Sequence, residues 1–271
     1  MKIFIMTDME GCAGILNHDD WVLPTGRYYE QGQKILTEET NAVIEGLFAG
    51  GAAEILVCDG HGKGGIAPLL LDARVRLQRG WPAEAIFPFG LDASFNGVAF
   101  VGQHAKSRTD YSHITHTDWF DVLEDTINGI AIGEYGHTAF CAAELGVPCI
   151  FAGGEEALAL EAAALTSGVV TVAVKQGVMK DGLDHLSEDD YRKAKLGAIH
   201  LSHAEAIRRL HAGALQAAQQ LKNNPGQFSI PALKPPYARV IRYRASHGKP
   251  PRTVRYRHPT SVIALLNLPF K

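Results

Sequence analysis

Three apolar runs in the first part of the chain are each followed by residue types that bind metal ions. The runs and the residues after them are 3–6 with Asp8 and Glu10, 55–58 with His61, and 98–102 with His104. If these runs are parallel strands of one open sheet, their carboxyl ends share the edge where such sheets bind ligands. Carboxylate oxygens and imidazole nitrogens without cysteine favour zinc, with manganese and cobalt as alternatives. The sequence therefore predicts a metal site at this edge.

Asp8 and Glu10 are separated by one residue. In an extended segment their side chains point to the same face, about 7 Å apart, and such a pair can reach two neighbouring ions. An acidic residue after a strand can also cap a helix or lie in a solvated turn. His61 and His104 favour the metal site, because each follows its strand directly and faces the acidic pair.

Glu134 is a third candidate carboxylate. It follows the apolar segment 127–133, which we expect to form a turn and a strand that deliver it to the head of the next helix. An acid in the first turn of a helix also needs no function, since the helix dipole favours it there. Together with Asp8 and Glu10 it supplies about three negative charges against the four positive charges of two Zn²⁺ ions. Without cations the three carboxylates would repel one another, so the charge balance favours two ions.

The polar segment 111–117 contains two histidines three residues apart, His113 and His116. Either could act as an acid, a base or a nucleophile that does not bind metal. Both could also lie in a surface loop without a function. Their spacing alone does not choose between these interpretations.

Alternating apolar runs and helical patterns predict the elements that position these residues. The fold class is α/β, with a mostly parallel sheet flanked by helices and a smaller α+β C-terminal unit. Expected strands are 3–6, 55–58, 98–102, 149–152 and 169–174, and expected helices are 33–49, 135–145 and 155–165. A long helix at 202–221 and two arginine-rich strands at 239–244 and 253–258 follow. We expect a catalytic domain over residues 1–176 and a smaller domain over residues 177–271.

Composition argues against several classes of protein. The 271 residues carry a net charge of −3, which predicts neither nucleic-acid nor membrane binding and indicates a small substrate. The arginines on the two terminal strands could contact nucleic acid, but charged residues on edge strands more often serve to prevent edge-to-edge pairing. Walker A, G-x-G-x-x-G and G-x-S-x-G motifs are absent from the sequence. No apolar run approaches 18 residues and the four cysteines form no C-x-x-C pair, so we expect a cytoplasmic protein with reduced thiols.

Several separated motifs together resemble the bacterial D-aminopeptidases, a zinc peptidase family typified by the enzyme of a dipeptide-transport operon. The motifs are Asp8-Met9-Glu10-Gly11, Leu36-Thr37-Glu38-Glu39, Asp59-Gly60-His61-Gly62-Lys63, Gly102-Gln103-His104-Ala105, Thr115-His116-Thr117, Ile132-Gly133-Glu134 and Ala173-Val174-Lys175-Gln176. They occur in the family's order. The resemblance covers roughly residues 1–180, and the segment after it matches poorly.

The resemblance implies a binuclear zinc site, with two Zn²⁺ per chain and Asp8 as the bridge. The residues on the family's ligand positions are Asp8, Glu10, His61, His104 and Glu134. The catalytic histidine of the family falls on His116, because the hydroxyl-His-hydroxyl pattern and the spacing to Glu134 fit there. His113 is then a bystander, and Lys175 lies in one of these motifs without an assigned role.

The function that the resemblance implies is a zinc-dependent aminopeptidase, which hydrolyses the N-terminal residue from short peptides or amino-acid amides and favours D-residues. Members of this family can assemble into rings, so the resemblance also implies a homo-oligomer. Two other functions fit the same residues. One is a binuclear metal amidase acting on another small substrate, with identical ligands and different pocket walls. The other is a non-catalytic metal- or ligand-binding protein, in which His116 has no required role.

Overall fold

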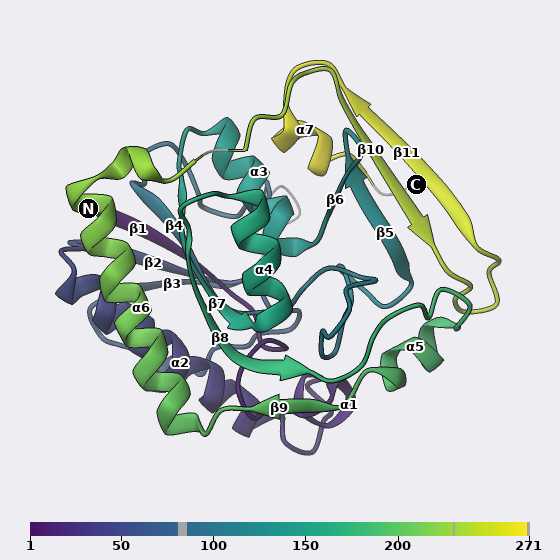
Figure 1. Cartoon of the computed structure of the whole chain (residues 1–271), viewed down its shortest axis with the longest axis horizontal. Coiled ribbons are helices and arrows are strands. Elements are labelled where there is room, and N and C mark those ends of the chain that lie inside the picture. Colours follow the sequence, from purple (N-terminus) through teal and green to yellow (C-terminus); the bar gives the residue numbers. More distant parts are fainter. Residues whose placement is uncertain (81–85, 230, 270–271) are drawn as a thin grey trace.

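The main layer of the molecule is a seven-stranded sheet with the order β3-β2-β1-β4-β7-β8-β9 (Figure 1). The computed structural model describes residues 1–80, 86–229 and 231–269. The strands are β1 (Lys2–Thr7), β2 (Glu54–Asp59), β3 (Arg76–Gln78), β4 (Gly97–Gln103), β7 (Cys149–Glu155), β8 (Val170–Gly177) and β9 (Ala198–His200). Neighbouring strands pair in parallel except β8 and β9, which are antiparallel. The mostly parallel sheet predicted from the sequence is confirmed.

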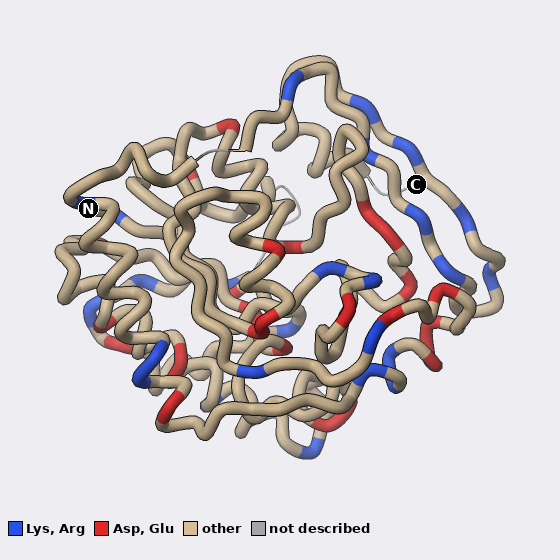
Figure 2. Tube along the Cα trace, in the orientation of Figure 1, with Lys and Arg blue, Asp and Glu red and all other residues tan. Residues whose placement is uncertain are grey.

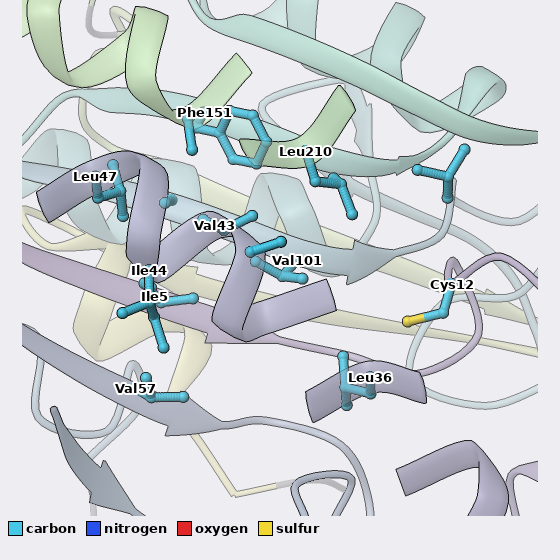
Figure 3. Close-up of a cluster of buried hydrophobic side chains, with 14 of the residues drawn as sticks. Ile5, Cys12, Leu36, Val43, Ile44, Leu47, Val57, Val101, Phe151 and Leu210 are labelled. Carbon is cyan, nitrogen blue, oxygen red and sulfur yellow. The ribbon is translucent and has the colours of Figure 1, made fainter. Parts of the chain in front are cut away.

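Side-chain alternation along the central strand explains why helices cover both faces of this sheet. In β1, Ile3 and Ile5 lie in one core cluster and Phe4 and Met6 lie in another. The first cluster packs against α2 (Tyr29–Ala49) and α6 (His203–Asn223), and the second against α3 (Glu134–Glu144) and α4 (Glu156–Leu165). Figure 3 shows part of the first cluster, with Ile5 of β1, Leu47 of α2 and Val101 of β4 among its labelled side chains. Both faces are therefore buried, as expected for a parallel sheet.

The two long helices α2 and α6 pack closely on one another. A Cβ at Gly46 of α2 would lie 2.4 Å from the main-chain oxygen of His211 in α6, so a residue without a side chain is required there. The Ser202 side chain caps α6 by accepting a hydrogen bond from the Glu205 N–H. This cap confirms the predicted start of the long helix.

A second sheet of four antiparallel strands has the order β11-β10-β5-β6. Its strands are β5 (Val122–Ile127), β6 (Ile130–Ile132), β10 (Tyr237–Tyr243) and β11 (Arg252–His258), and α7 (Val262–Leu266) packs beside them. Figure 2 shows basic residues along the length of β10 and β11. The remaining helices are α1 (His18–Trp21), α5 (Glu188–Ala194) and the single turns η1 (Pro68–Leu70) and η2 (Pro225–Gln227).

The division into domains at residues 1–176 and 177–271 stays a prediction, but strand pairing crosses it twice. β9 extends the main sheet by pairing with β8. β10 pairs with β5, which comes from the other side of the predicted boundary. The C-terminal part of the chain therefore contributes to both sheets.

Within the described residues, no helix is long and apolar enough to cross a membrane. Cys12, Cys58, Cys141 and Cys149 are all buried, and none is paired in a disulfide with another described residue.

Candidate active site

The direction in which the chain winds through the main sheet reverses between β1 and β4. From β1 the chain adds β2 and β3 on one side, and from β4 it adds β7 and β8 on the other. The loops that leave two such strands diverge and open a crevice at their carboxyl ends, where open α/β sheets bind ligands. Asp8 follows β1 and His104 follows β4, so both lie at this reversal.

The five predicted ligands lie together at this edge, with Asp8 between two histidines. Asp8 Oδ1 is 3.0 Å from His61 Nδ1, and Asp8 Oδ2 is 3.2 Å from His104 Nε2. Glu10 Oε2 lies 3.2 Å from His61 Nδ1. Glu134 Oε1 lies 3.3 Å from His104 Nε2. The cluster therefore consists of a Glu10–His61 group and a His104–Glu134 group that share Asp8.

Glu134 reaches the cluster through a tight hairpin. Asn128 and Gly129, between β5 and β6, both have positive φ values of 51° and 81°, which is the pattern of a two-residue hairpin turn. After β6, Gly133 precedes the first turn of α3, which begins with Glu134. The turn and strand expected from the sequence are confirmed.

Burial and charge shape the ionisation of the cluster. Asp8, Glu10, His61 and His104 are all less than a tenth exposed, and the Glu134 side chain is 27% exposed. Burial opposes the charged form of Asp8, but hydrogen bonds and charge from His104 and His61 hold its pKa well below the usual value. Burial lowers the pKa of both histidines, and the neighbouring carboxylates outweigh it and raise each pKa well above normal. This concentration of negative charge would equally stabilise a divalent cation.

Three histidines share one hydrogen-bonding pattern. His61 Nε2 lies 3.2 Å from the Val22 carbonyl oxygen, His104 Nδ1 lies 3.0 Å from that of Ala105, and His116 Nδ1 lies 2.8 Å from that of Ile114. In the neutral ring the nitrogen beside the carbonyl carries the proton, so the other nitrogen offers a lone pair to the cluster. Histidines that bind metals are oriented by such outer hydrogen bonds.

Two buried atoms of the cluster, Glu10 Oε2 and His104 Nε2, have no hydrogen-bond partner of good geometry among the described residues. Buried polar atoms without a partner are uncommon, because leaving them unpaired is costly. Cations bound at the cluster would satisfy both atoms. Together with the oxygen and nitrogen donor set, this shows that the residues present fit divalent metal ions such as zinc.

His116 and His113 occupy different surroundings. His116 Nε2 lies 3.9 Å from both Glu10 Oε1 and Glu134 Oε1, and its ring stacks on that of His104 with 4.0 Å between centroids. Both ring nitrogens of the fully buried His113 are occupied, because Nδ1 accepts a hydrogen bond from Lys175 and Nε2 donates to the Leu16 carbonyl. His116 is therefore the one of the pair that adjoins the cluster.

A cavity of about 550 Å³ opens over the cluster. Its polar lining includes Asp8, Glu10, His61, His116 and Glu134, with Lys63, Asp118 and His137 on the walls. The apolar lining consists of Met6, Val22, Leu23, Pro24, Phe87, Phe89 and Trp119. A volume of this size suits a small molecule or a short peptide.

Several residues around the cluster were not among the predicted site residues. Gln103 Nε2 donates to Asp8 Oδ2 at 2.9 Å and to Glu134 Oε2 at 3.3 Å. Lys175 Nζ donates to the main-chain oxygen of Glu10 and to His113. Gln103 and Lys175 lie in motifs that carry the family resemblance, so the sequence did contain a signal for both.

Glu155 at the end of β7 was also absent from the predicted site. Its buried carboxylate accepts hydrogen bonds from Ala105 N at 2.7 Å, from His113 N at 2.7 Å and from the Ser112 hydroxyl. It therefore anchors both ends of the loop between His104 and His116. A carboxylate soon after the apolar run 149–152 was the available signal, because the other candidates follow strands in the same way.

Known proteins resemble this chain in sequence and in fold. The family model described as D-aminopeptidase, of peptidase family M55, matches residues 1–264. A D-aminopeptidase from Bacillus subtilis (strain 168) is 34% identical over 192 residues, which are 69% of this chain and 68% of that protein. The solved structure of the Zn-dependent D-aminopeptidase DppA from Bacillus subtilis, described as a self-compartmentalizing protease, matches with a TM-score of 0.82 at 26% identity, over 98% of this chain and 94% of that one.

The family match continues far beyond residue 180, so the expectation that the resemblance ends there is wrong. The physical reason is that β9 and β10 complete sheets begun by earlier strands, and the later segment is part of the same fold. This chain belongs to the D-aminopeptidase family.

Proposed function

We propose that this chain is a zinc-dependent aminopeptidase that removes the N-terminal residue, preferably a D-residue, from short peptides or amino-acid amides. The observation that carries the proposal is the buried cluster in which two histidine–carboxylate groups share Asp8. Its unpartnered atoms, Glu10 Oε2 and His104 Nε2, lie beneath a cavity large enough for a small peptide. The zinc dependence of the related Bacillus subtilis enzyme supports this metal.

Five residues would hold two zinc ions. Glu10 and His61 would hold one, His104 and Glu134 the other, and Asp8 would bridge them, because each of its oxygens faces one histidine. Zinc supplies Lewis acidity towards a carbonyl oxygen and makes a water molecule more acidic. Gln103 donates to Asp8 and Glu134 and would keep both carboxylates oriented.

His116 is the proposed catalytic residue. Burial, and then the charge of His104, lower its pKa, which favours the neutral ring. The Ile114 carbonyl fixes the proton on Nδ1, so Nε2 presents a lone pair beside Glu10 and Glu134. This nitrogen can accept a proton from attacking water and return it to the leaving amine, or attack a carbonyl directly. Stabilisation of an oxyanion would instead require the protonated ring.

The assembly and location of the protein are part of the proposal. The related Bacillus subtilis enzyme is described as self-compartmentalizing, which supports a homo-oligomer for this chain and a ring that encloses the active sites. Four unpaired buried cysteines support a cytoplasmic location. Neither nucleic acid nor a membrane is a proposed partner.

The test is hydrolysis of D-Ala-D-Ala and of L-Ala-L-Ala, with and without a chelator. We expect faster turnover of the D-dipeptide, loss of activity in chelator and recovery on addition of zinc. His116→Ala should retain zinc and lose most turnover, whereas His211→Ala, on the partly buried surface of α6, should change neither. Full activity of His116→Ala would refute its role. If neither dipeptide is cleaved but another amide is, the chain is the alternative amidase, and zinc binding without any turnover would indicate a binding protein.

A further inference from the structure

A second group of charged side chains lies on the cavity wall beside the proposed zinc site. Asp118 and His137 line the cavity. Behind them, His137 Nε2 lies 2.8 Å from Asp125 Oδ2, and Arg239 contacts the same carboxylate through Nη2 at 2.6 Å and Nε at 2.9 Å. His137, Asp125 and Arg239 are each at most 5% exposed, whereas the Asp118 side chain is 40% exposed. The group therefore presents one carboxylate to the cavity.

Asp118 is held in place through its backbone. Its N–H donates to Glu134 Oε1 at 2.9 Å, and its φ of 57° lies in the left-handed region, which Asp adopts more readily than most residues. Glu134 is a proposed zinc ligand, and Asp118 is two residues from His116. The Asp118 carboxylate is thus fixed beside the proposed reaction centre without belonging to it.

Among the described residues, the Asp118 carboxylate has no hydrogen-bond partner of good geometry. His137 Nδ1 and Arg239 Nη2 each lie 3.5 Å from an oxygen of Asp118, beyond ordinary hydrogen-bond distance. Because Arg239 donates its hydrogen bonds to Asp125, the Asp118 carboxylate can form a closer ion pair with a positively charged group in the cavity. His137 Nε2 lies closer to Asp125 Oδ2, at 2.8 Å, than to the Arg239 Nη2 donor, at 3.3 Å, so in the neutral ring we assign the proton to Nε2, which donates to Asp125. Nδ1 and Asp118 Oδ1 are then two acceptors that face the same space. A donor with several N–H groups and a positive charge would satisfy both.

A divalent metal ion suits this position less well. The oxygens of Asp125 already accept hydrogen bonds from Arg239 and His137, so they are not free to act as ligands. The Arg239 guanidinium also lies 3.5 Å from Asp118 Oδ2 and would repel a doubly charged ion. An ammonium group carries half that charge and provides directed donors.

The location selects which ammonium group of a substrate would bind. In an N-terminal residue, the α-nitrogen and the scissile carbonyl carbon are about 2.5 Å apart by standard bond geometry. A site next to Glu134 and His116 therefore suits the α-ammonium. A basic side chain of the substrate would extend away from these residues into a cavity whose lining is partly apolar, with Leu23, Phe87 and Phe89.

We propose that Asp118 and His137 form the subsite that binds the α-ammonium group of the substrate, an inference that rests on the aminopeptidase function proposed above. The subsite explains how the enzyme would select peptides with a free N-terminus. It also gives the Asp125–Arg239 pair a purpose, which is to hold His137 in the orientation that faces Asp118.

The experiment compares two inhibitors that differ only in the ammonium group, D-alanine hydroxamate and propionohydroxamate. Wild-type holoenzyme should bind the first about 10- to 100-fold more tightly, the range for one charge-assisted hydrogen bond. In Asp118→Asn this preference should fall to a few-fold, with propionohydroxamate binding and zinc content unchanged. Asp121→Asn is the matched control, because Asp121 lies on the same loop and outside the cavity lining.

An undiminished preference in Asp118→Asn would overturn the subsite while leaving the proposed function intact. His137→Gln is the second variant, used if Asp118→Asn does not fold, and should reduce the preference in the same direction. If wild-type enzyme cleaves no dipeptide and binds neither hydroxamate, the aminopeptidase function fails, and the subsite fails with it.

Discussion

The loop between His104 and His116 should depend on the buried carboxylate of Glu155. Four non-glycine residues in or just after this loop have positive φ values, including the β-branched Ile114 at 54°. Such conformations cost about 1–2 kcal/mol each and persist only where surrounding contacts hold them. Glu155 provides three of those contacts, to Ala105 N, His113 N and the Ser112 hydroxyl.

Glu155→Gln keeps the size of the side chain and removes its charge. Whichever way the amide is oriented, its NH₂ group faces a buried backbone N–H, and leaving that donor unpaired costs about 1–3 kcal/mol. The remaining hydrogen bonds lose their charge-assisted strength, about 1 kcal/mol more. We therefore expect a loss of about 2–4 kcal/mol, which lowers Tm by roughly 6–12 °C for a protein of this size.

Differential scanning fluorimetry of the zinc-loaded enzyme measures this shift, and D-Ala-D-Ala hydrolysis reports the accompanying loss of geometry. We expect kcat to fall roughly 10- to 100-fold, since the loop carries His116. The control is Glu156→Gln, the next residue, which lies in the first turn of α4 and should change stability by less than about 1 kcal/mol. If the two variants had equal Tm and kcat, the anchoring role of Glu155 would be refuted.

Two further predictions concern positions in the motifs that carry the family resemblance. Burial raises the pKa of Glu39 to about 7, above its ordinary 4.5, so the folded protein keeps this proton to a higher pH than the unfolded chain. The free energy of unfolding should therefore fall by roughly 3 kcal/mol as the pH rises from about 4.5 to about 7, and urea denaturation measures this fall. In Glu39→Gln this fall should be absent, and equal pH dependence of the two proteins would contradict the prediction. Gly11→Ala would place a Cβ 2.0 Å from the Gln103 carbonyl oxygen, so we expect a stability loss of at least about 3 kcal/mol and reduced zinc content. The control is Gly62→Ala, which should be nearly neutral because its Cβ would have no described atom within 4 Å.

The residues of the proposed zinc site could be selected from the sequence because their signal is local. A strand that is buried on both faces gives a continuous apolar run, and the polar residue that follows it marks the carboxyl end. Asp8, His61 and His104 follow β1, β2 and β4 in this way. The resemblance then added His116, which local spacing did not distinguish from His113.

The supporting residues could not be predicted, because they depend on which strands become neighbours. Glu155 reaches the loop after His104 only because β7 pairs with β4. Arg239 reaches Asp125 across 114 positions of sequence because β10 pairs with β5. Apolar periodicity identifies strands and leaves their order open, so neither contact follows from it. The same limit explains why the C-terminal segment looked separate from the catalytic part.

The proposed function requires that each chain bind two zinc ions at the cluster around Asp8 and need both for turnover. Titration of zinc-free protein with Zn²⁺, while following hydrolysis of D-Ala-D-Ala and quantifying bound metal by mass spectrometry, measures this requirement. We predict that activity reaches its plateau at two equivalents per chain, and that Asp8→Asn, which weakens the shared ligand, binds fewer. Full activity at one equivalent or less would contradict the binuclear site.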